Sequence, residues 1–198
     1  MDITAKFGRF TLNRLQILGR SGIFLLAAIF QAFLPPFRIR RLVKEIEFIG
    51  SKSFLIVFVT ALFTGMVLGI QGYYSLSQFG AEAALGVMVA LSIIRELGPV
   101  LCSLMVAGRA GSAITAEIGI MKITDQFPAL EMMAIDPLKY VISPKIIAGI
   151  LSLPLLTAFF NLVGIAGGYL VGVKLLGVNE GAYLGKMVLA ITFTDIYG

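Results

Sequence analysis

The chain has 198 residues, of which 58 % are hydrophobic and only 14 % are charged, and its net charge is +5 at pH 7. Soluble domains carry about 25 % charged residues, so this composition indicates a membrane protein. The sequence contains no histidine, which excludes a histidine-based metal site and a Ser–His triad within the chain, and its one cysteine, Cys102, excludes an internal disulfide bond.

Basic residues cluster toward the N-terminus. Nine of the sixteen Lys and Arg residues come before residue 53, and the rest of the sequence has no basic patch with interleaved aromatic residues. A charge distribution of this kind does not favour binding to nucleic acid. Nucleic acid is therefore not expected among the partners.

Residues 1–34 are predicted to form an elbow helix that lies in the membrane surface. The stretch KFGRFTLNRLQILGR (6–20) mixes Phe and Leu with Lys and Arg, which is typical of a helix whose apolar face enters the lipid while its cations reach the headgroups. The apolar run at 21–34 is shorter than the roughly 20 residues that a span needs, and PPFRIRR (35–41) ends it. A short true span over this run is the alternative.

Three longer apolar segments are predicted to cross the membrane, at 53–73, 83–109 and 146–173. The first has the uncharged core FLIVFVTALFTGMVLGI (54–70), and the third is an uncharged run of 28 residues. The second is long enough but is interrupted by a charged pair. Residues 181–198 are only mildly apolar and are expected to form a helix at the outer face instead of a complete span.

The basic residues also set the expected orientation. The segment before the first span carries nine of them, the turn at 71–82 carries none, and the connection at 109–145 again carries several. Lys and Arg concentrate in cytoplasmic loops. The N-terminus and residues 109–145 are therefore expected in the cytoplasm, and the turn at 71–82 is expected outside.

Arg95 and Glu96 stand side by side in the middle of the second predicted span. The segments on either side, 83–94 and 97–108, are apolar, so the pair does not mark a helix end. Adjacent residues of a helix point about 100° apart, so each charge needs a partner elsewhere or a water-filled cavity. Charged groups inside a membrane usually mark a transport pathway. This role is favoured, and a purely structural ion pair is the alternative.

Small residues recur four apart on two predicted spans. Gly65 and Gly69 show this spacing on the first span, and Gly164, Gly168 and Gly172 show it on the third. Such spacing lets two helix backbones approach closely, either within one subunit or across a dimer. In AGRAGSA (107–113), the Arg109 side chain is expected to extend along the helix toward lipid headgroups.

The segment 124–136 is predicted to form a short amphipathic helix on the cytoplasmic side. Asp125 is expected to cap it, and Asp136-Pro137 is expected to end it. The apolar residues Phe127, Leu130 and Met133 or Ala134 recur at helical spacing, and Met132 and Met133 form an adaptable apolar knob. Because so short a helix is marginally stable alone, it is expected to dock either on the bilayer surface or in a groove of a cytoplasmic partner.

Two absences limit the chemistry of the chain. No G-x-x-x-x-G-K-[ST] motif occurs, so the chain has no phosphate-binding loop with which to act as its own ATPase. No nucleophile–base pair is evident, and Cys102 lies in a predicted span with no histidine to activate it. Neither a catalytic residue nor a metal site is expected, and Cys102 is expected to be an inert packing residue.

Four motifs occur in order from Arg95 onward: RELGP, AGRAGSA, AEIGIM and ALEMMAIDP. Together they resemble the signature region of the MlaE/YrbE permeases. These are the membrane subunits of bacterial ABC systems that move phospholipids for outer-membrane lipid asymmetry, and of related MCE systems. The resemblance runs from the N-terminal elbow to the end of the chain. It implies an all-α integral membrane protein with an elbow helix and a transmembrane helix bundle, in one domain over residues 1–198. Members of the family have two further spans, so the chain is expected to be a C-terminally truncated form of that bundle.

The resemblance also implies partners. It predicts a homodimer that binds a dimer of cytoplasmic ABC ATPases, an MCE-domain ring protein in the periplasm, and a small STAS-type accessory protein on the ATPase. Phospholipid would be the cargo, and ATP and Mg²⁺ would be cofactors of the ATPase and not of this chain. The implied location is the bacterial inner membrane, with several spans and a cytoplasmic N-terminus.

Two sets of site residues follow from the resemblance. A lipid cavity at the dimer interface, open outward, would be lined by Leu68, Leu76, Phe79, Arg95 and Glu96. The cytoplasmic helix would couple to the ATPase, together with the stretch before it, through Glu117, Gly119, Asp125, Phe127, Leu130, Glu131, Met132 and Met133.

The expected function is that of a permease subunit that moves phospholipids between the inner membrane and an MCE-protein carrier. The alternative is an ion-coupled secondary transporter that uses Glu96 as its proton carrier. A membrane-embedded enzyme acting on lipid is a third reading, which the lack of histidine and of a paired nucleophile disfavours.

Overall fold

In the computed structural model of the chain, the structure describes residues 3–32 and 39–190, and within these ranges it is all-helical, with no strand. Three helical segments are long and apolar enough to cross a membrane, at Ile39–Ser77, Glu82–Ile123 and Leu138–Leu175. The predicted all-α class is therefore confirmed, and each of the three predicted spans falls within one of these long apolar helical segments. Each segment is longer than expected, because the helix continues through charged residues that the sequence analysis treated as flanks.

The chain divides into two compact units, which are described separately. Residues 1–45 and 120–149 form one, called here the elbow unit, and residues 46–119 and 150–198 form the other, called the span unit. Helices α2 (Ile39–Ser77), α5 (Ser112–Ile123) and α7 (Ser143–Tyr169) contribute residues to both units.

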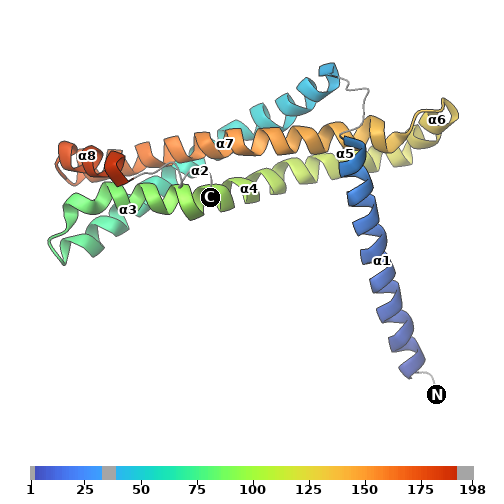
Figure 1. The fold of residues 1–198 in the computed structure, drawn as a ribbon, viewed down its shortest axis with the longest axis horizontal. Coiled ribbons are helices and arrows are strands. Elements are labelled where there is room, and N and C mark those ends of the chain that lie inside the picture. The colour runs from blue at the N-terminus through green and yellow to red at the C-terminus, as the bar shows by residue number, and fades with distance from the viewer. Residues whose placement is uncertain (1–2, 33–38, 191–198) are drawn as a thin grey trace. The chain divides into compact units, whose positions relative to one another are not determined.

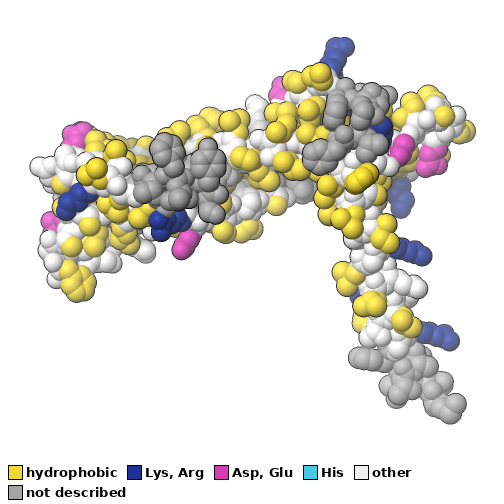
Figure 2. All heavy atoms as spheres, viewed as in Figure 1, with side chains coloured by type: hydrophobic (Ala, Val, Ile, Leu, Met, Phe, Trp, Pro, Cys, Tyr) yellow, Lys and Arg dark blue, Asp and Glu magenta, His cyan; other side chains and the backbone are white. Residues whose placement is uncertain are grey.

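The elbow unit contains α1 (Ile3–Ala32), α6 (Gln126–Met132) and the π-helical turn Leu138–Ile142, together with the adjoining ends of α2, α5 and α7. A helix was predicted over residues 1–34, and α1 confirms it over the described part of that range. Along the described part of α1, dark-blue Arg side chains project mainly from one side and apolar side chains lie mainly on the other (Figure 2), as expected for a helix at a membrane surface.

Polar contacts join the segments of the elbow unit. The Lys145 ammonium is only 5 % exposed and lies 3.0 Å from both carboxylate oxygens of Glu45. Arg41 donates from Nη1 to the carbonyl oxygen of Tyr140 at 3.0 Å, and its guanidinium lies 3.6 Å from the centre of the Tyr140 ring. These contacts tie the start of α2 to the start of α7.

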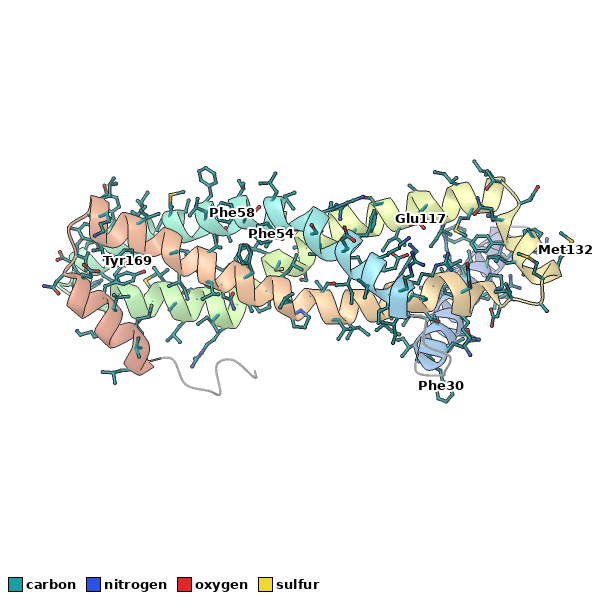
Figure 3. The ribbon with its side chains drawn as sticks, turned by 90° about the horizontal axis from the view of Figure 1, so that it is seen from above. Phe30, Phe54, Phe58, Glu117, Met132 and Tyr169 are labelled. Atoms are coloured by element: carbon teal, nitrogen blue, oxygen red, sulfur yellow. The ribbon has the colours of Figure 1, made fainter. Side chains whose placement is uncertain are left out.

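The span unit is built on a close contact between α2 and α7. A Cβ atom on Gly65 would overlap the carbonyl oxygen of Gly164, and a Cβ on Gly69 would lie 3.2 Å from the carbonyl oxygen of Gly168. The predicted glycine spacing therefore brings two backbones together within one subunit. The contact between Phe54 on α2 and Phe159 on α7, with ring centres 4.3 Å apart, extends the same interface (Figure 3).

The second span returns along this pair as α3 (Leu85–Ser92), the π-helical turn Ile93–Leu97, α4 (Gly98–Val106), a second π-helical turn over Ala107–Gly111, and α5. After α7 comes a further π-helical turn, Leu170–Leu175, and then α8 (Glu180–Ala190), which packs beside α3 (Figure 1). The helix that was predicted over 181–198 is present up to residue 190, and the remainder of that range lies outside the described residues.

Candidate functional site

The second span has an expanded turn at its charged pair. In the π-helical turn Ile93–Leu97, the N–H of Gly98 donates to the carbonyl oxygen of Ile93, five residues earlier. Such a turn inserts one extra residue into an α-helix and is frequent at functional sites. Arg95 and Glu96 occupy this turn, and both are exposed on the surface of the single chain. The pair therefore lies inside the helix, as expected, and on its outer side.

The extra residue changes the spacing of the buried face. Leu85, Val89 and Ile93 are buried at intervals of four, and the same interval separates Gly98 from Cys102, but the step from Ile93 to Gly98 is five. A regular helix would bury a residue every three or four positions. The next buried residue after Ile93 thus comes one position later than in a regular helix. Arg95 and Glu96 lie in the expanded turn between Ile93 and Gly98.

The pair lies deep in the span. Arg95 comes 13 residues (95 − 82) after Glu82, where this span begins, which is about 20 Å along a helix axis. The hydrocarbon layer of a bilayer is about 30 Å thick. Exposed charges are costly wherever they meet lipid tails, so the face that carries them is better suited to water or another protein surface than to lipid.

The other predicted lipid-site residues lie on α2 and in the turn after it. Phe79 is 82 % exposed in this turn, and the carbonyl oxygen of Leu76 accepts hydrogen bonds from the N–H groups of Phe79 (3.1 Å) and Ala81 (3.0 Å). Leu68 is half-buried nine residues (77 − 68) before the end of α2, or about 14 Å along the axis. The five residues therefore occupy two levels of one unit, with Leu76 and Phe79 at the turn and the other three deeper.

The cytoplasmic helix is shorter than predicted at both ends. Asp125 does occupy the N-cap position of α6, but it adopts a left-handed conformation (φ 53°) and its side chain makes no capping hydrogen bond. A capping side chain needs an extended backbone to reach the first free N–H groups. The prediction that Asp125 caps this helix is therefore wrong.

The predicted end of the same helix is also wrong. Helix α6 ends at Met132, and Ala134 follows in a left-handed conformation (φ 56°). The N–H of Ala134 donates to Glu131 and that of Ile135 donates to Leu130, each at 2.9 Å, which is the Schellman motif that usually has glycine at the left-handed position. Asp136 instead begins the next helical segment, where its Oδ1 accepts the N–H of Leu138 at 2.9 Å.

The exposed apolar surface of α6 is its C-terminal end. Met132 is 83 % exposed and Met133 is 62 % exposed, and Figure 3 shows Met132 at the tip of the turn that carries α6. Phe127 is half-buried, and Leu130 is 8 % exposed and packs into the elbow unit. Glu131 is exposed beside the two methionines. The structure thus separates an exposed apolar tip, Met132 and Met133, from the residues that hold α6 in place.

Glu117 and Gly119, the other predicted coupling residues, belong to the span unit. Both are exposed on α5, and a Cβ atom on Gly119 would meet no other atom within 4 Å. Both are therefore accessible in the single chain, and no packing contact with the described residues explains the glycine.

Arg109 does not extend toward headgroups as predicted. Its Nη1 donates to the carbonyl oxygen of Phe48 at 2.7 Å and to Oγ of the fully buried Ser53 at 3.3 Å, and its guanidinium lies 5.0 Å from the centre of the Phe48 ring. The second π-helical turn, Ala107–Gly111, carries this residue. Arg109 therefore ties the second span to α2.

An aromatic and charged cluster lies at the α7–α8 end of the span unit. The Tyr169 hydroxyl donates to Glu180 Oε1 at 2.6 Å, and the rings of Tyr169 and Tyr183 meet edge to face at 5.8 Å. Tyr183 is fully buried and its hydroxyl has no hydrogen-bond partner among the described residues. This burial raises the pKa of the Tyr183 phenol to about 12.

The sequence analysis missed a residue that lies against the charged turn. Asn161 on α7 has a buried Oδ1 that meets Gly98, the residue directly after the turn. The available signal was that Asn161 is the one side-chain amide in the uncharged run 146–173. Within the described residues, no three Cys, Asp or Glu side chains are placed to hold a metal ion.

Comparison with known proteins identifies the family. Residues 42–198 match the family model described as Permease MlaE. The chain is 45 % identical over 98 % of its length to the intermembrane phospholipid transport system permease protein MlaE of Haemophilus influenzae, of which it covers 74 %. It is 43 % identical to a probable ABC transporter permease protein of Rickettsia bellii, over 93 % of this chain and 71 % of that protein. It is also 36 % identical, over 71 % of this chain and 40 % of that protein, to the chloroplastic protein TRIGALACTOSYLDIACYLGLYCEROL 1 of Arabidopsis thaliana. The chain therefore belongs to the MlaE permease family.

Proposed function

We propose that this chain is the permease subunit of an ABC transporter that moves phospholipids between the inner membrane and an MCE-protein carrier and so maintains the lipid asymmetry of the outer membrane. The observation that supports the proposal is the exposed Arg95–Glu96 pair, about 20 Å along a helical segment that is long and apolar enough to cross a membrane. Zwitterionic and anionic headgroups offer both an anion and a cation as partners for such a pair.

A homodimer would supply the enclosed chamber that these charges require. Two copies of the span unit, with their Arg95–Glu96 turns facing each other, would keep both charges away from lipid tails and leave a wet cavity between them. Leu76 and Phe79 at the outer turn would meet the acyl chains. The cavity would open toward the MCE-domain ring protein in the periplasm.

The energy would come from a separate ATPase dimer, with ATP and Mg²⁺ bound there and a STAS-type accessory attached to it. Met132 and Met133 form the exposed tip that would enter a groove on the ATPase, because a methionine pair adapts to an apolar groove. The N-terminus would lie in the cytoplasm, as the basic residues before residue 53 favour. On this proposal the chain has no enzymatic activity of its own.

The lipid site is tested by neutralising both charges. The Arg95→Ala, Glu96→Ala double variant should lose ATP-dependent transfer of labelled phospholipid between vesicles and the MCE carrier, while the complex with the ATPase still assembles. The matched control, Glu82→Ala with Lys186→Ala, removes one exposed anion and one exposed cation elsewhere in the span unit and should retain transfer. Unchanged transfer in the Arg95–Glu96 variant contradicts the proposal, as does lipid transfer driven by a pH gradient without the ATPase.

The ATPase contact is tested at the exposed tip, Met132 and Met133. Met132→Ser combined with Met133→Ser should weaken co-purification of the ATPase at least about tenfold, since apolar anchors at a small interface are often worth more than 1.4 kcal/mol. The control is Val188→Ser on α8, which removes an apolar side chain that is 67 % exposed. If the two variants bind the ATPase equally well, the assignment of α6 is wrong.

A further inference from the structure

The second and third spans meet through a regular series of contacts that is offset at one point. Leu85 packs against Gly172, Val89 against Gly168 and Ile93 against Gly164, and the next contact joins Gly98 to Asn161. The steps along the second span are four, four and five, while those along the third span are four, four and three. Where the second span takes a five-residue step from Ile93 to Gly98, α7 takes a three-residue step from Gly164 to Asn161. A regular four-residue step on α7 would have reached position 160 instead.

Gly98 and Asn161 fit each other closely. A Cβ atom at position 98 would overlap Asn161 Oδ1 and would lie 3.0 Å from Asn161 Cγ and 2.7 Å from the carbonyl oxygen of Ile93. Position 98 therefore accepts only glycine as long as the turn is expanded and Asn161 is in place. An amide oxygen, which carries no hydrogen atoms, can approach a glycine Cα more closely than a methyl group can.

The Oδ1 atom of Asn161 makes no hydrogen bond among the described residues that would stabilise the fold. It is also buried. A buried polar atom without a partner is unfavourable, and more so in a membrane span, where an apolar side chain has no such cost. An amide kept in this position is thus expected to have a functional reason.

We propose that Asn161 is a positioning residue, which holds the π-helical turn Ile93–Leu97 in its expanded form and so fixes the directions of Arg95 and Glu96. The inference rests on the proposed function in one respect, namely that these two charges meet lipid headgroups. With leucine at position 161, the methyl groups would push Gly98 away, and the turn would relax toward a regular helix. The Arg95 and Glu96 side chains would then turn about the helix axis by as much as about 100°.

The test measures how accessible the side chains at positions 95 and 96 are, by thiol labelling of the assembled transporter in membranes. Arg95→Cys and Glu96→Cys are made separately, once in the protein with the native Asn161 and once together with Asn161→Leu. The rate at which each cysteine reacts with a polar maleimide is then measured. Cys102 is fully buried and serves as an internal reporter of unfolding. Thr157→Val is the matched control, because Thr157 lies four residues away on α7 and faces Cys102 where the second span is a regular helix.

A rotation covers one position and exposes the other, so the ratio of the two labelling rates should change on the order of tenfold in Asn161→Leu. Cys102 should stay unreactive, and Thr157→Val should leave the ratio unchanged. The proposal is overturned if the ratio stays within about twofold of the native value. It is also overturned if Cys102 becomes reactive in Asn161→Leu, or if Thr157→Val changes the ratio equally, since either result indicates general loosening of the helix pair.

Lipid transfer by the Asn161→Leu variant, with Arg95 and Glu96 intact, separates this inference from the proposed function. Loss of transfer together with the changed ratio supports both. A changed ratio with normal transfer supports the positioning role and contradicts the assignment of Arg95 and Glu96 to the lipid site.

Discussion

The contact between Gly65 and Gly164 gives a prediction whose size follows from the structure. In Gly65→Ala, the new Cβ would overlap the Gly164 carbonyl oxygen and would lie 2.6 Å from its carbonyl carbon. Carbon atoms in contact are about 3.5–4.0 Å apart, so α2 and α7 would have to separate by about 1 Å. The obstacle is backbone, which cannot rotate away, so we expect the upper end of the usual cost of overpacking, about 3 kcal/mol.

The assay is thermal unfolding in detergent, followed with a dye that becomes fluorescent on reaction with the buried thiol of Cys102. For a chain of this size, about 3 kcal/mol lowers the Tm by roughly 6–12 °C. The control is Gly50→Ala on the same helix, where the new Cβ would meet side-chain atoms of Leu156 and Ser152 at an ordinary 3.9 Å. Alanine is a better helix former than glycine by about 0.5–1 kcal/mol, so Gly50→Ala should leave the Tm unchanged or raise it slightly. Equal Tm values for the two variants would refute the reasoning.

Three further predictions concern buried polar groups. Glu45→Gln leaves Lys145 buried and without its carboxylate, which should destabilise the chain by about 3–5 kcal/mol in chemical denaturation. Arg109→Lys keeps the charge but cannot both donate to Phe48 and Ser53 and stack on the Phe48 ring, so a loss of about 1–2 kcal/mol is expected in the same assay. Tyr183→Phe should be neutral at pH 7 because the hydroxyl has no described partner. The raised pKa of Tyr183, about 12, means that the tyrosine protein loses stability as pH rises from about 10 to 12, whereas the phenylalanine variant should resist this loss.

A control variant or a contradicting result can be stated for each of these three substitutions. Glu47→Gln removes an exposed carboxylate from the same helix as Glu45 and should change stability little. If it costs as much as Glu45→Gln, the buried pair is not the cause. Stability of Arg109→Lys equal to that of the native chain would show that the contacts to α2 contribute nothing. A parallel loss of stability above pH 10 in native and Tyr183→Phe proteins would rule out the phenol as its source.

The number and place of the spans could be predicted from the sequence because an uncharged run of sufficient length has few other stable arrangements. The close approach at Gly65 and Gly164 could be predicted for the same kind of reason, since four-residue glycine spacing leaves a flat strip on a helix. Whether that strip faced the same chain or a second copy could not be decided, because both partners satisfy the same spacing.

The ends of the cytoplasmic helix could not be predicted. Ala134 takes a conformation that alanine seldom adopts, and the hydrogen bonds to Leu130 and Glu131 that compensate for it form only once the chain has turned. The polar groups of Asp125 and Asp136 are typical of helix caps, yet one has a left-handed backbone and the other starts the following segment. Local residue type was therefore a poor guide where the turn geometry is set by the whole loop.

The position of Arg95 and Glu96 in the second span was predicted, but the π-helical turn that carries them was not. Arg95 and Glu96 were visible as an interruption of an apolar run, whereas the one-residue offset between Ile93 and Gly98 depends on which residues of α7 they meet. Asn161 was overlooked because a single amide in a long apolar run carries no periodic signal.

The offset at Ile93–Leu97 has a consequence for how the gene tolerates change. Losing one codon from within a membrane helix normally rotates everything downstream and destroys the fold. At this turn, the loss of one codon between Ile93 and Gly98 would restore four-residue spacing and keep the downstream residues of the second span on its buried face. Such a deletion should give a protein that still inserts and assembles but has lost the proposed contacts of Arg95 and Glu96 with headgroups, a defect confined to transport that random mutagenesis of the gene could recover.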